Sequence, residues 1–200
     1  MFEGRDLACA RGGQLVFERL DFALESGDVL LLRGPNGSGK STLLRLLAGL
    51  LPRACGRLFW RGAAIEPGEP EHHARLHFLG HANGLKPQLT VRENLTFAAA
   101  LSLGAPVPPK ALETFDLEGL MDTPVRYLSS GQRRRVALAR LFAPWRPLWL
   151  LDEPETGLDE ANRRRLLWAV EDHRRLGGLV VWATHGTFEL ASALVLEFGA

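Results

Sequence analysis

Apolar and polar residues alternate along the first 27 residues of the chain, and two adjacent glycines, Gly12 and Gly13, interrupt the alternation. A period of two is typical of strands that bury one face, and paired glycines favour a tight turn between two such strands. The pattern predicts an antiparallel sheet over residues 2–27. Residues 28–32 are instead almost continuously apolar, which is typical of a strand that is covered on both faces.

The rest of the chain carries strand patterns and helix patterns in turn. Short apolar runs near glycine or proline predict strands over residues 75–80, 148–151, 179–182 and 193–198, with a hairpin over 56–62 and a loop over 67–70. Apolar residues at helical spacing predict helices over residues 42–51, 95–103, 110–115 and 160–175. Thr90 and Glu93 form a capping-box pattern ahead of the second helix, and Pro52 is expected to end the first.

These elements indicate an α/β fold with a mostly parallel sheet at its core, an antiparallel β subdomain and an inserted helical subdomain. With 200 residues, 46% of them hydrophobic, the chain can bury one good core and hardly two. We therefore expect a single domain over residues 1–200. Its core is expected to consist of residues 1–81 and 145–200, and its helical subdomain of residues from about 82 to 144.

The composition narrows the range of partners. A formal net charge of +1 gives no electrostatic argument for nucleic acid, and no nucleic acid partner is expected. Cys9 and Cys55 lack metal-ligand or redox spacing, so we expect two buried or semi-buried thiols in a reducing cytoplasm. No signal peptide opens the chain, and no apolar run approaches the ~20 residues that span a bilayer. If the protein works at a membrane, another chain must do the spanning.

A glycine-rich segment joins the strand at residues 28–32 to the helix that follows it. Its glycines let successive backbone N–H groups point at phosphate oxygens, and the positive end of the helix dipole adds to the attraction. Lys40 can reach the β- and γ-phosphates of a nucleotide, and the Ser41 hydroxyl can ligate Mg²⁺. The alternative, an ordinary glycine-rich turn, is disfavoured by the flanking strand and helix. The residues predicted to bind nucleotide are Gly34, Pro35, Asn36, Gly37, Ser38, Gly39, Lys40, Ser41 and Thr42.

Two acids, Asp152 and Glu153, end the apolar strand at residues 148–151. Asp152 can hold the Mg²⁺ shell, and Glu153 is placed to accept a proton from a water molecule that attacks the γ-phosphate. Two acids beside a turn proline are common on their own. Together with Lys40, they indicate a nucleotide hydrolase.

The segment Ser129, Ser130, Gly131 and Gln132 precedes a helix rich in arginine. In isolation, a serine N-cap would be sufficient to explain it. However, it lies within the helical region and upstream of Asp152, where it closely resembles the signature sequence of ATP-binding cassette (ABC) ATPases. The resemblance continues along the chain: Asp159 resembles the acid of the family's D-loop, and Thr184 with His185 resembles its switch histidine.

This resemblance implies a mechanical ATPase that uses ATP as substrate and Mg²⁺ as cofactor. Two copies would pack head to tail, and the signature residues of one copy would contact the γ-phosphate of the ATP bound to the other. His185 would sense that phosphate and position the attacking water with Glu153. Closure of the dimer would then depend on one phosphate group, as in other γ-phosphate switches.

The chain departs from the family pattern at three places. Most cassettes have a glutamine ahead of the helical insertion, whereas this chain has His81, which we keep as a further candidate ligand of Mg²⁺. Ser130 replaces the usual glycine of the signature, which is harmless unless the residue needs a positive φ. The aromatic residue that usually stacks on adenine is missing near Arg11, so Arg11 and Phe17 are both candidates for that contact.

His73, His77 and His81 recur with a spacing of four residues, which raises the alternative of a metal or haem site. No acid or cysteine ligand strengthens that hypothesis. Solvated or hydrogen-bonded histidines are the simpler interpretation.

Several stretches resemble the ATP-binding subunit of the bacterial haem exporter of cytochrome c maturation, namely residues 79–81, 84–86, 89–95, 124–125 and 132–141. That resemblance implies a peripheral subunit on the cytoplasmic face of the inner membrane, bound to integral membrane subunits. The alternatives are an ATPase subunit of another exporter, for a drug or a lipid, and a soluble cassette protein of DNA repair or translation.

Overall fold

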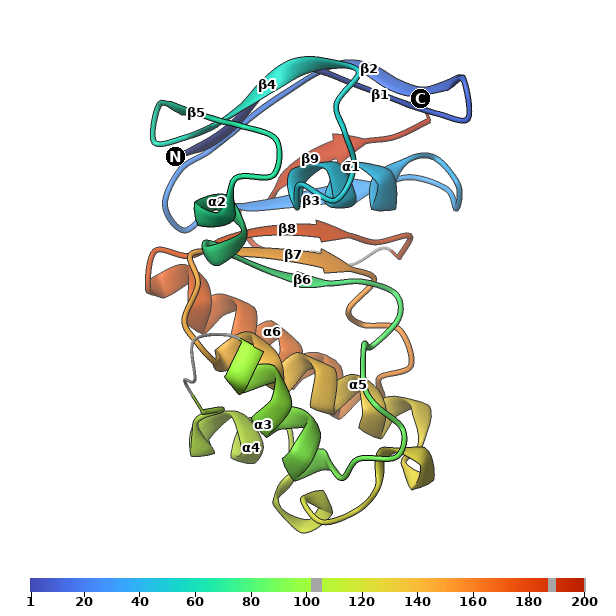
Figure 1. Cartoon of the computed structure of the whole chain (residues 1–200), viewed down its shortest axis with the longest axis vertical. Helices are drawn as coiled ribbons and strands as arrows, with labels where there is room; N and C mark the ends of the chain where they lie inside the picture. Colours follow the sequence, from blue (N-terminus) through green and yellow to red (C-terminus); the bar gives the residue numbers. More distant parts are fainter. Residues whose placement is uncertain (102–105, 187–189, 200) are drawn as a thin grey trace. The chain divides into compact units, whose positions relative to one another are not determined.

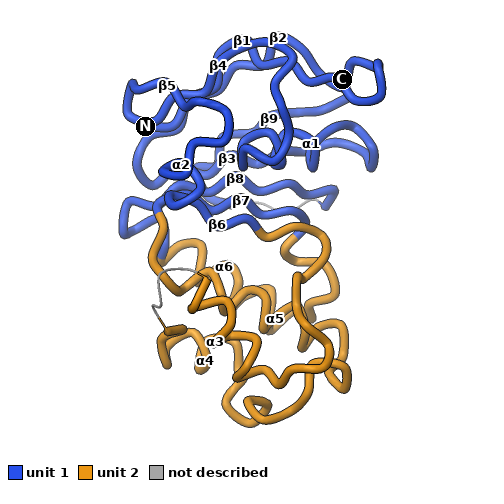
Figure 2. Tube along the Cα trace, viewed as in Figure 1, with its two compact units in different colours: residues 1–78, 147–153, 173–200 blue, residues 79–146, 154–172 orange. Residues whose placement is uncertain are grey.

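The structure is a computed structural model that describes residues 1–101, 106–186 and 190–199 (Figure 1). The chain divides into two compact units (Figure 2). Unit 1 comprises residues 1–78, 147–153 and 173–200, and unit 2 comprises residues 79–146 and 154–172.

The antiparallel sheet predicted at the start of the chain is present in unit 1. Its strands are β1 (Phe2–Arg11), β2 (Gln14–Leu24), β4 (Cys55–Trp60) and β5 (Ala63–Ile65), in the order β2-β1-β4-β5. The turn between β1 and β2 falls at Gly12 and Gly13, both of which have positive φ. Strands β4 and β5 form the hairpin that the sequence predicts around residues 56–62.

The second sheet of unit 1 has the strand order β6-β7-β8-β3-β9. Its strands are β3 (Val29–Arg33), β6 (Leu76–Leu79), β7 (Leu148–Asp152), β8 (Leu179–Ala183) and β9 (Leu194–Glu197). Strand β3 pairs in parallel with β8 and β9, and β7 pairs in parallel with β8. The continuous apolar runs of β3, β7 and β8 are buried almost throughout, as strands covered on both faces should be.

Helix α1 (Lys40–Leu47) lies between the two sheets and fills the core of unit 1 with leucines (Figure 1). The sequence predicts this helix over residues 42–51 with Pro52 as its end, and both bounds are wrong. Gly49 ends it instead, because it adopts a φ of 73° and its N–H donates to Leu46 O at 2.9 Å, while the N–H of Leu50 donates to Arg45 O at 2.8 Å. This pair of bonds is a Schellman motif, which needs a residue of positive φ.

Two further details of unit 1 differ from expectation. The chain forms a short helix, α2 (Pro70–Ala74), that the sequence analysis misses because five residues are too few to show a helical period. Its His72 is buried, and one ring nitrogen, Nε2, lies 2.7 Å from Leu47 O. Burial lowers the pKa of His72. Of the two thiols, Cys9 is buried as expected, whereas Cys55 is exposed at the start of β4.

Unit 2 is mostly helical. Its helices are α3 (Val91–Leu101), α4 (Pro109–Thr114), α5 (Ser130–Ala139) and the greater part of α6 (Glu160–Arg175), with 3-10 turns at Glu118–Leu120, Val125–Tyr127 and Arg140–Phe142. The capping box ahead of α3 is confirmed: Glu93 N–H donates to Thr90 Oγ1 at 3.2 Å, and Thr90 N–H donates to Glu93 Oε2 at 2.7 Å. The last two residues of the predicted helix 95–103 lie outside the described residues.

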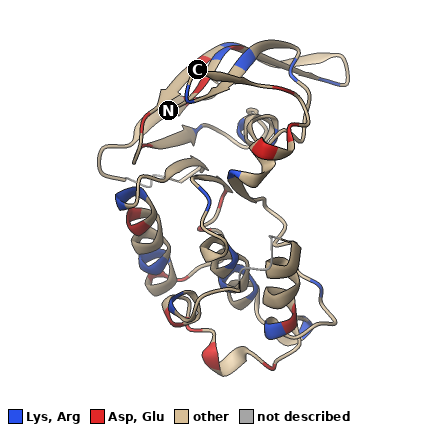
Figure 3. Ribbon diagram, turned by 60° about the vertical axis from the view of Figure 1, so that its left-hand side comes forward, with Lys and Arg blue, Asp and Glu red and all other residues tan. Residues whose placement is uncertain are grey.

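Charged residues of both signs are interspersed along the helices of unit 2 (Figure 3). No helix in the described part of the chain is both long and apolar enough to cross a membrane.

Arg134 of α5 is a buried arginine that ties three segments of unit 2 together. It is 3% exposed, and its guanidinium donates to Pro154 O at 3.1 Å, to Gly80 O at 3.0 Å and to Asn83 Oδ1 at 2.9 Å. The planar fork of an arginine suits this divergent set of acceptors, and the single ammonium of a lysine does not.

We therefore expect Arg134→Lys to lower the free energy of unfolding by about 2 kcal/mol, because buried carbonyl groups lose charged donors. Urea unfolding followed by circular dichroism measures the loss. Arg133→Lys, one position earlier in α5, is the matched control and should unfold like the parent chain. Equal free energies of unfolding of the two variants would contradict the stabilising role of the Arg134 hydrogen bonds.

Candidate active site

The glycine-rich segment predicted to bind phosphate connects β3 to α1 in unit 1. It depends on glycine at both ends. Gly34 has a φ of 140° and Gly39 a φ of 111°, values that side chains of other residues rarely allow. A Cβ atom at Gly34 would also lie 2.3 Å from Phe198 O, which leaves no room for alanine.

Lys40 lies inside this loop. Lys40 is buried, with 5% of its surface exposed. Its ammonium donates to Gly34 O at 2.6 Å and to Pro35 O at 2.8 Å. The loop therefore wraps around a positive charge. Near it, the Ser38 hydroxyl is buried with no hydrogen-bond partner among the described residues. An unsatisfied buried hydroxyl next to a buried cation suits an anionic ligand rich in oxygen.

Two oxygen donors meet where α1 begins and β7 ends. Ser41 Oγ lies 2.8 Å from Asp152 Oδ1, and Asp152 is 3% exposed. These residues are far apart in sequence, and the parallel sheet brings them together. A hydroxyl and a carboxylate are hard oxygen ligands, and Mg²⁺ is commonly held by one or two such groups together with water and substrate phosphates. The pair therefore fits Mg²⁺.

Glu153 has an unusual backbone conformation for a residue other than glycine. Its φ is 48°, and its N–H donates to Ala183 O at 2.9 Å. Such a conformation costs about 1–3 kcal/mol and is concentrated at functional sites. It directs the carboxylate toward His185, whose Nδ1 lies 3.1 Å from Glu153 Oε1. The side chains are 19% and 52% exposed respectively, so water can reach the pair.

The signature segment lies in unit 2 at the start of α5. Ser129 is the N-cap: its Oγ accepts from Gln132 N–H at 3.1 Å, and its N–H donates to Gln132 Oε1 at 2.8 Å. The simple capping interpretation is thus correct for the local structure. Ser130 is the first residue of α5 and has no positive φ, so its replacement of glycine causes no strain. A Cβ at Gly131 would lie 2.9 Å from Gly157 O, so the two segments approach closely here.

Asp159 is also a capping residue in unit 2. Its Oδ1 accepts from Asn162 N–H at 2.8 Å, and this bond lowers the pKa of the carboxyl group. His81 is exposed and belongs to unit 2. No group of three or more His, Cys, Asp or Glu among the described residues could hold a metal ion, so the spacing of His73, His77 and His81 does not correspond to a cluster.

The glycine-rich loop also contacts Phe198, which no pattern in the sequence indicates. Phe198 is 7% exposed and packs its ring against Phe17, with ring centroids 6.1 Å apart at 88°. Phe17, one of the two candidates for stacking on a base, is therefore partly covered by another ring. The other candidate, Arg11, is exposed at the end of β1.

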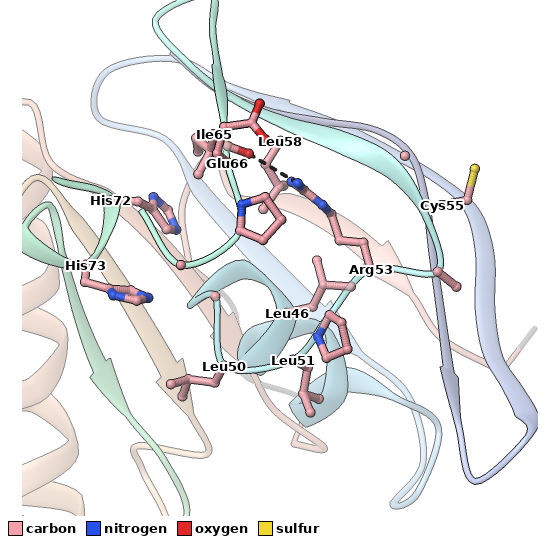
Figure 4. A pocket seen from close by; sticks show the side chains of 16 residues that line it. Leu46, Leu50, Leu51, Arg53, Cys55, Leu58, Ile65, Glu66, His72 and His73 are labelled. Carbon is pink, nitrogen blue, oxygen red and sulfur yellow. Dashed lines mark hydrogen bonds between the residues drawn. The ribbon is translucent and has the colours of Figure 1, made fainter. Parts of the chain in front are cut away.

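A separate cavity of about 480 Å³ lies at the opposite end of α1 (Figure 4). Most of its lining is apolar, including Leu46, Leu51 and Ile65, and Arg53 donates to Ile65 O at 3.2 Å. None of the residues predicted to bind nucleotide lines it.

The family of the chain follows from comparison with known proteins. A family model described as ABC transporter matches residues 17–156. The chain therefore belongs to the ABC transporter family and is an ATP-binding ABC ATPase.

Among its relatives are proteins named cytochrome c biogenesis ATP-binding export protein CcmA. The protein from Rhodospirillum rubrum is 49% identical, over 98% of this chain and 84% of its own length. Those from Paramagnetospirillum magneticum and Nitrosococcus oceani are 47% and 44% identical, over 98% and 97% of this chain and 93% and 90% of their own lengths.

Solved structures agree on the fold. A putative ABC transporter ATP-binding protein from Pyrococcus furiosus superposes with a TM-score of 0.85 at 26% identity, over 98% of this chain and 96% of that chain. A second match, with a TM-score of 0.79 at 21% identity over 93% of this chain and 88% of the other, is a dimeric ATP-binding cassette in a post-hydrolysis state with ADP and phosphate. The predicted α/β class, with parallel and antiparallel sheets, is confirmed.

Since the ammonium of Lys40 is the charge that the loop encloses, Lys40→Ala should reduce ATP hydrolysis by about 10²- to 10³-fold, the usual effect of removing one preorganised donor. Phosphate release from ATP measures the effect. Lys110→Ala is the matched control, because Lys110 is paired with Asp172 in unit 2. Hydrolysis by Lys40→Ala at the rate of the control would rule out this loop as the active site.

Proposed function

We propose that this protein is the ATPase subunit of a membrane complex that delivers haem for cytochrome c biogenesis. The observation that carries the proposal is the 44–49% identity, over nearly the whole chain, to the CcmA export proteins. On this account, residues 1–200 form one nucleotide-binding domain whose helical subdomain spans residues 82–144. It is peripheral, and it lies on the cytoplasmic face of the inner membrane.

The proposed chemistry begins with the phosphate loop. Residues 34–42 bind the triphosphate, with Lys40 exchanging its two carbonyl partners for phosphate oxygens. Ser41 and Asp152 hold Mg²⁺, and His81 is proposed as an additional acceptor for its shell. When bound, the ion offsets the negative charge of the phosphates.

Glu153 is the proposed general base. Its carboxylate accepts a proton from the water that attacks the γ-phosphate, and His185 holds that carboxylate in place through Nδ1. The 3.1 Å contact between the two side chains supports this division of roles. The positive φ of Glu153 supports it as well, because a strained turn fixes the direction of a catalytic side chain.

Two copies are proposed to bind ATP between them, with Ser129, Ser130, Gly131 and Gln132 of one copy contacting the nucleotide of the other and Asp159 lying in the D-loop. The cap formed by Ser129 is compatible with this role. A serine hydroxyl that accepts one hydrogen bond can still donate its own proton, here to a phosphate oxygen.

The membrane subunits are proposed to dock on residues 83–95 of unit 2. This segment is largely irregular, yet its backbone is held in place. Asn94 is 4% exposed. Its side-chain amide nitrogen Nδ2 donates to the carbonyls of Lys86, Leu89 and Thr90 at 3.1, 3.2 and 2.9 Å. Arg140 donates to Asn83 O at 3.0 Å. An ordered surface loses little entropy on binding a partner.

The Glu153→Gln variant separates ATP binding from hydrolysis. The amide keeps the shape of the side chain but cannot accept the proton, so hydrolysis should fall by about 10²- to 10⁴-fold while ATP still binds. The ATP-bound dimer should then accumulate in sedimentation runs with ATP and Mg²⁺. Glu113→Gln, an exposed acid in α4, is the control. Rapid hydrolysis by Glu153→Gln would contradict its role as base.

The biological role is tested in a strain that carries Lys40→Ala. If the ATPase drives haem delivery, this strain should lose covalently attached c-type haem and keep b-type haem, since haem synthesis is untouched. Haem staining of periplasmic proteins, compared with spectra of membrane b-type cytochromes, distinguishes the two. Normal c-type staining would reject haem delivery and favour an exporter of another substrate.

A further inference from the structure

The last described residues of unit 1 lie against the phosphate loop. Phe198 follows β9 directly, and its N–H donates to Arg33 O at 2.7 Å, at the point where β3 ends and the loop begins. Gly199 lies beside the loop as well: a Cβ there would be 3.6 Å from Pro35 and 3.8 Å from Ser38. Residues 33–38 and 198–199, which are far apart in the sequence, therefore lie side by side.

The backbone of Phe198 limits the first residue of the loop. A Cβ placed on Gly34 would lie 2.3 Å from Phe198 O and 3.0 Å from Phe198 Cβ. Contact this close means that Gly34 packs directly on the Phe198 backbone. The absence of a side chain permits the φ of 140° at Gly34, and packing against the Phe198 backbone helps to maintain it.

The ring of Phe198 lies beside the last residue of the loop. A Cβ on Gly39 would lie 3.5 Å from two atoms of that ring and 2.9 Å from Val16 Cγ1. Phe17 packs edge-on against the same ring. Phe198, which is 7% exposed, therefore has its ring beside Gly39 and its backbone against Gly34.

Besides Phe198, Val16 lies beside Gly39, and the middle of the loop is open to solvent. Pro35, Asn36 and Gly37 are exposed. The bonds from Lys40 to Gly34 O and Pro35 O are the ones that phosphate oxygens would replace. Phe198 adjoins Gly34 and Gly39 without contacting the Lys40 ammonium through a hydrogen bond, so phosphate binding to that ammonium does not require Phe198 to move.

We propose that Phe198 is a positioning residue for nucleotide binding: it acts through Gly34 and Gly39 to hold the phosphate loop in the conformation that binds ATP. The inference rests on the proposed role of residues 34–42 as the phosphate-binding loop. Removal of the ring lets the loop sample other conformations. The apparent affinity for ATP then falls in proportion to the fraction of molecules whose loop is in the binding conformation.

The test compares three variants of the full chain with the parent. Phe198→Ala removes the ring, Phe198→Leu keeps an apolar group against Gly39, and Leu196→Ala removes a partly buried side chain of the same strand that packs on the same core. Strand β9 keeps its backbone pairing with β3 in all three. The Kd for ATP, the KM and kcat for hydrolysis, and the melting temperature are measured for each.

Phe198→Ala should raise the Kd and KM for ATP by about tenfold, with kcat at saturating ATP changed by less than about threefold, since the competent loop still forms once ATP binds. Phe198→Leu should recover most of the affinity. Leu196→Ala should lower the melting temperature without changing the Kd. An unchanged Kd in Phe198→Ala would overturn the inference, and so would an equal loss of affinity in Leu196→Ala.

ATP binding by the Lys40→Ala variant tells failure of the Phe198 proposal apart from failure of the proposed nucleotide site. If Lys40→Ala weakens ATP binding and Phe198→Ala does not, the loop is the nucleotide site and the positioning role of Phe198 is wrong. If Lys40→Ala binds ATP as the parent does, the assignment of the loop fails and the inference fails with it.

Discussion

The structure of the site depends on how the backbone wraps around the ammonium of Lys40. Glycines at both ends of the loop permit φ values of 140° and 111°, and the carbonyls of Gly34 and Pro35 then converge on one cation. That places Ser41 at the first turn of α1, within hydrogen-bond distance of Asp152 at the end of β7. A buried cation, a hydroxyl and a carboxylate are thus assembled by the order of strands in a single sheet.

One of the strained backbone positions lies where the chemistry is proposed. Glu153 adopts a positive φ although it has a side chain, and the N–H of the strained residue is bonded to β8. The signature segment contrasts with this arrangement, because Ser129 and Gln132 form an unstrained capping box. The hydrogen bonds of this helix start are made within the segment itself.

Features that depend on neighbouring residues could be predicted from the sequence. The glycine-rich turn between β3 and α1, the capping box at Thr90 and the turn at Gly12 and Gly13 each need only a few adjacent residues. The predicted end of α1 is wrong because proline is the strongest helix-ending signal in this stretch, at Pro52. The helix ends before Pro52, at the Schellman motif formed by Gly49. The contact of Phe198 with the loop could not be predicted, since nothing near residue 198 indicates which strand β9 will join.

The central claim is that Lys40, Ser41, Asp152 and Glu153 form a site that binds and hydrolyses ATP. A crystal structure of the Glu153→Gln variant with ATP and Mg²⁺ tests it most directly. The account predicts a γ-phosphate oxygen within hydrogen-bond distance of Lys40 Nζ, the metal bound by Ser41 Oγ, and Ser129 of a second copy on the same phosphate. A nucleotide bound away from residues 34–42, with Lys40 still bonded to Gly34 O and Pro35 O, would contradict the account.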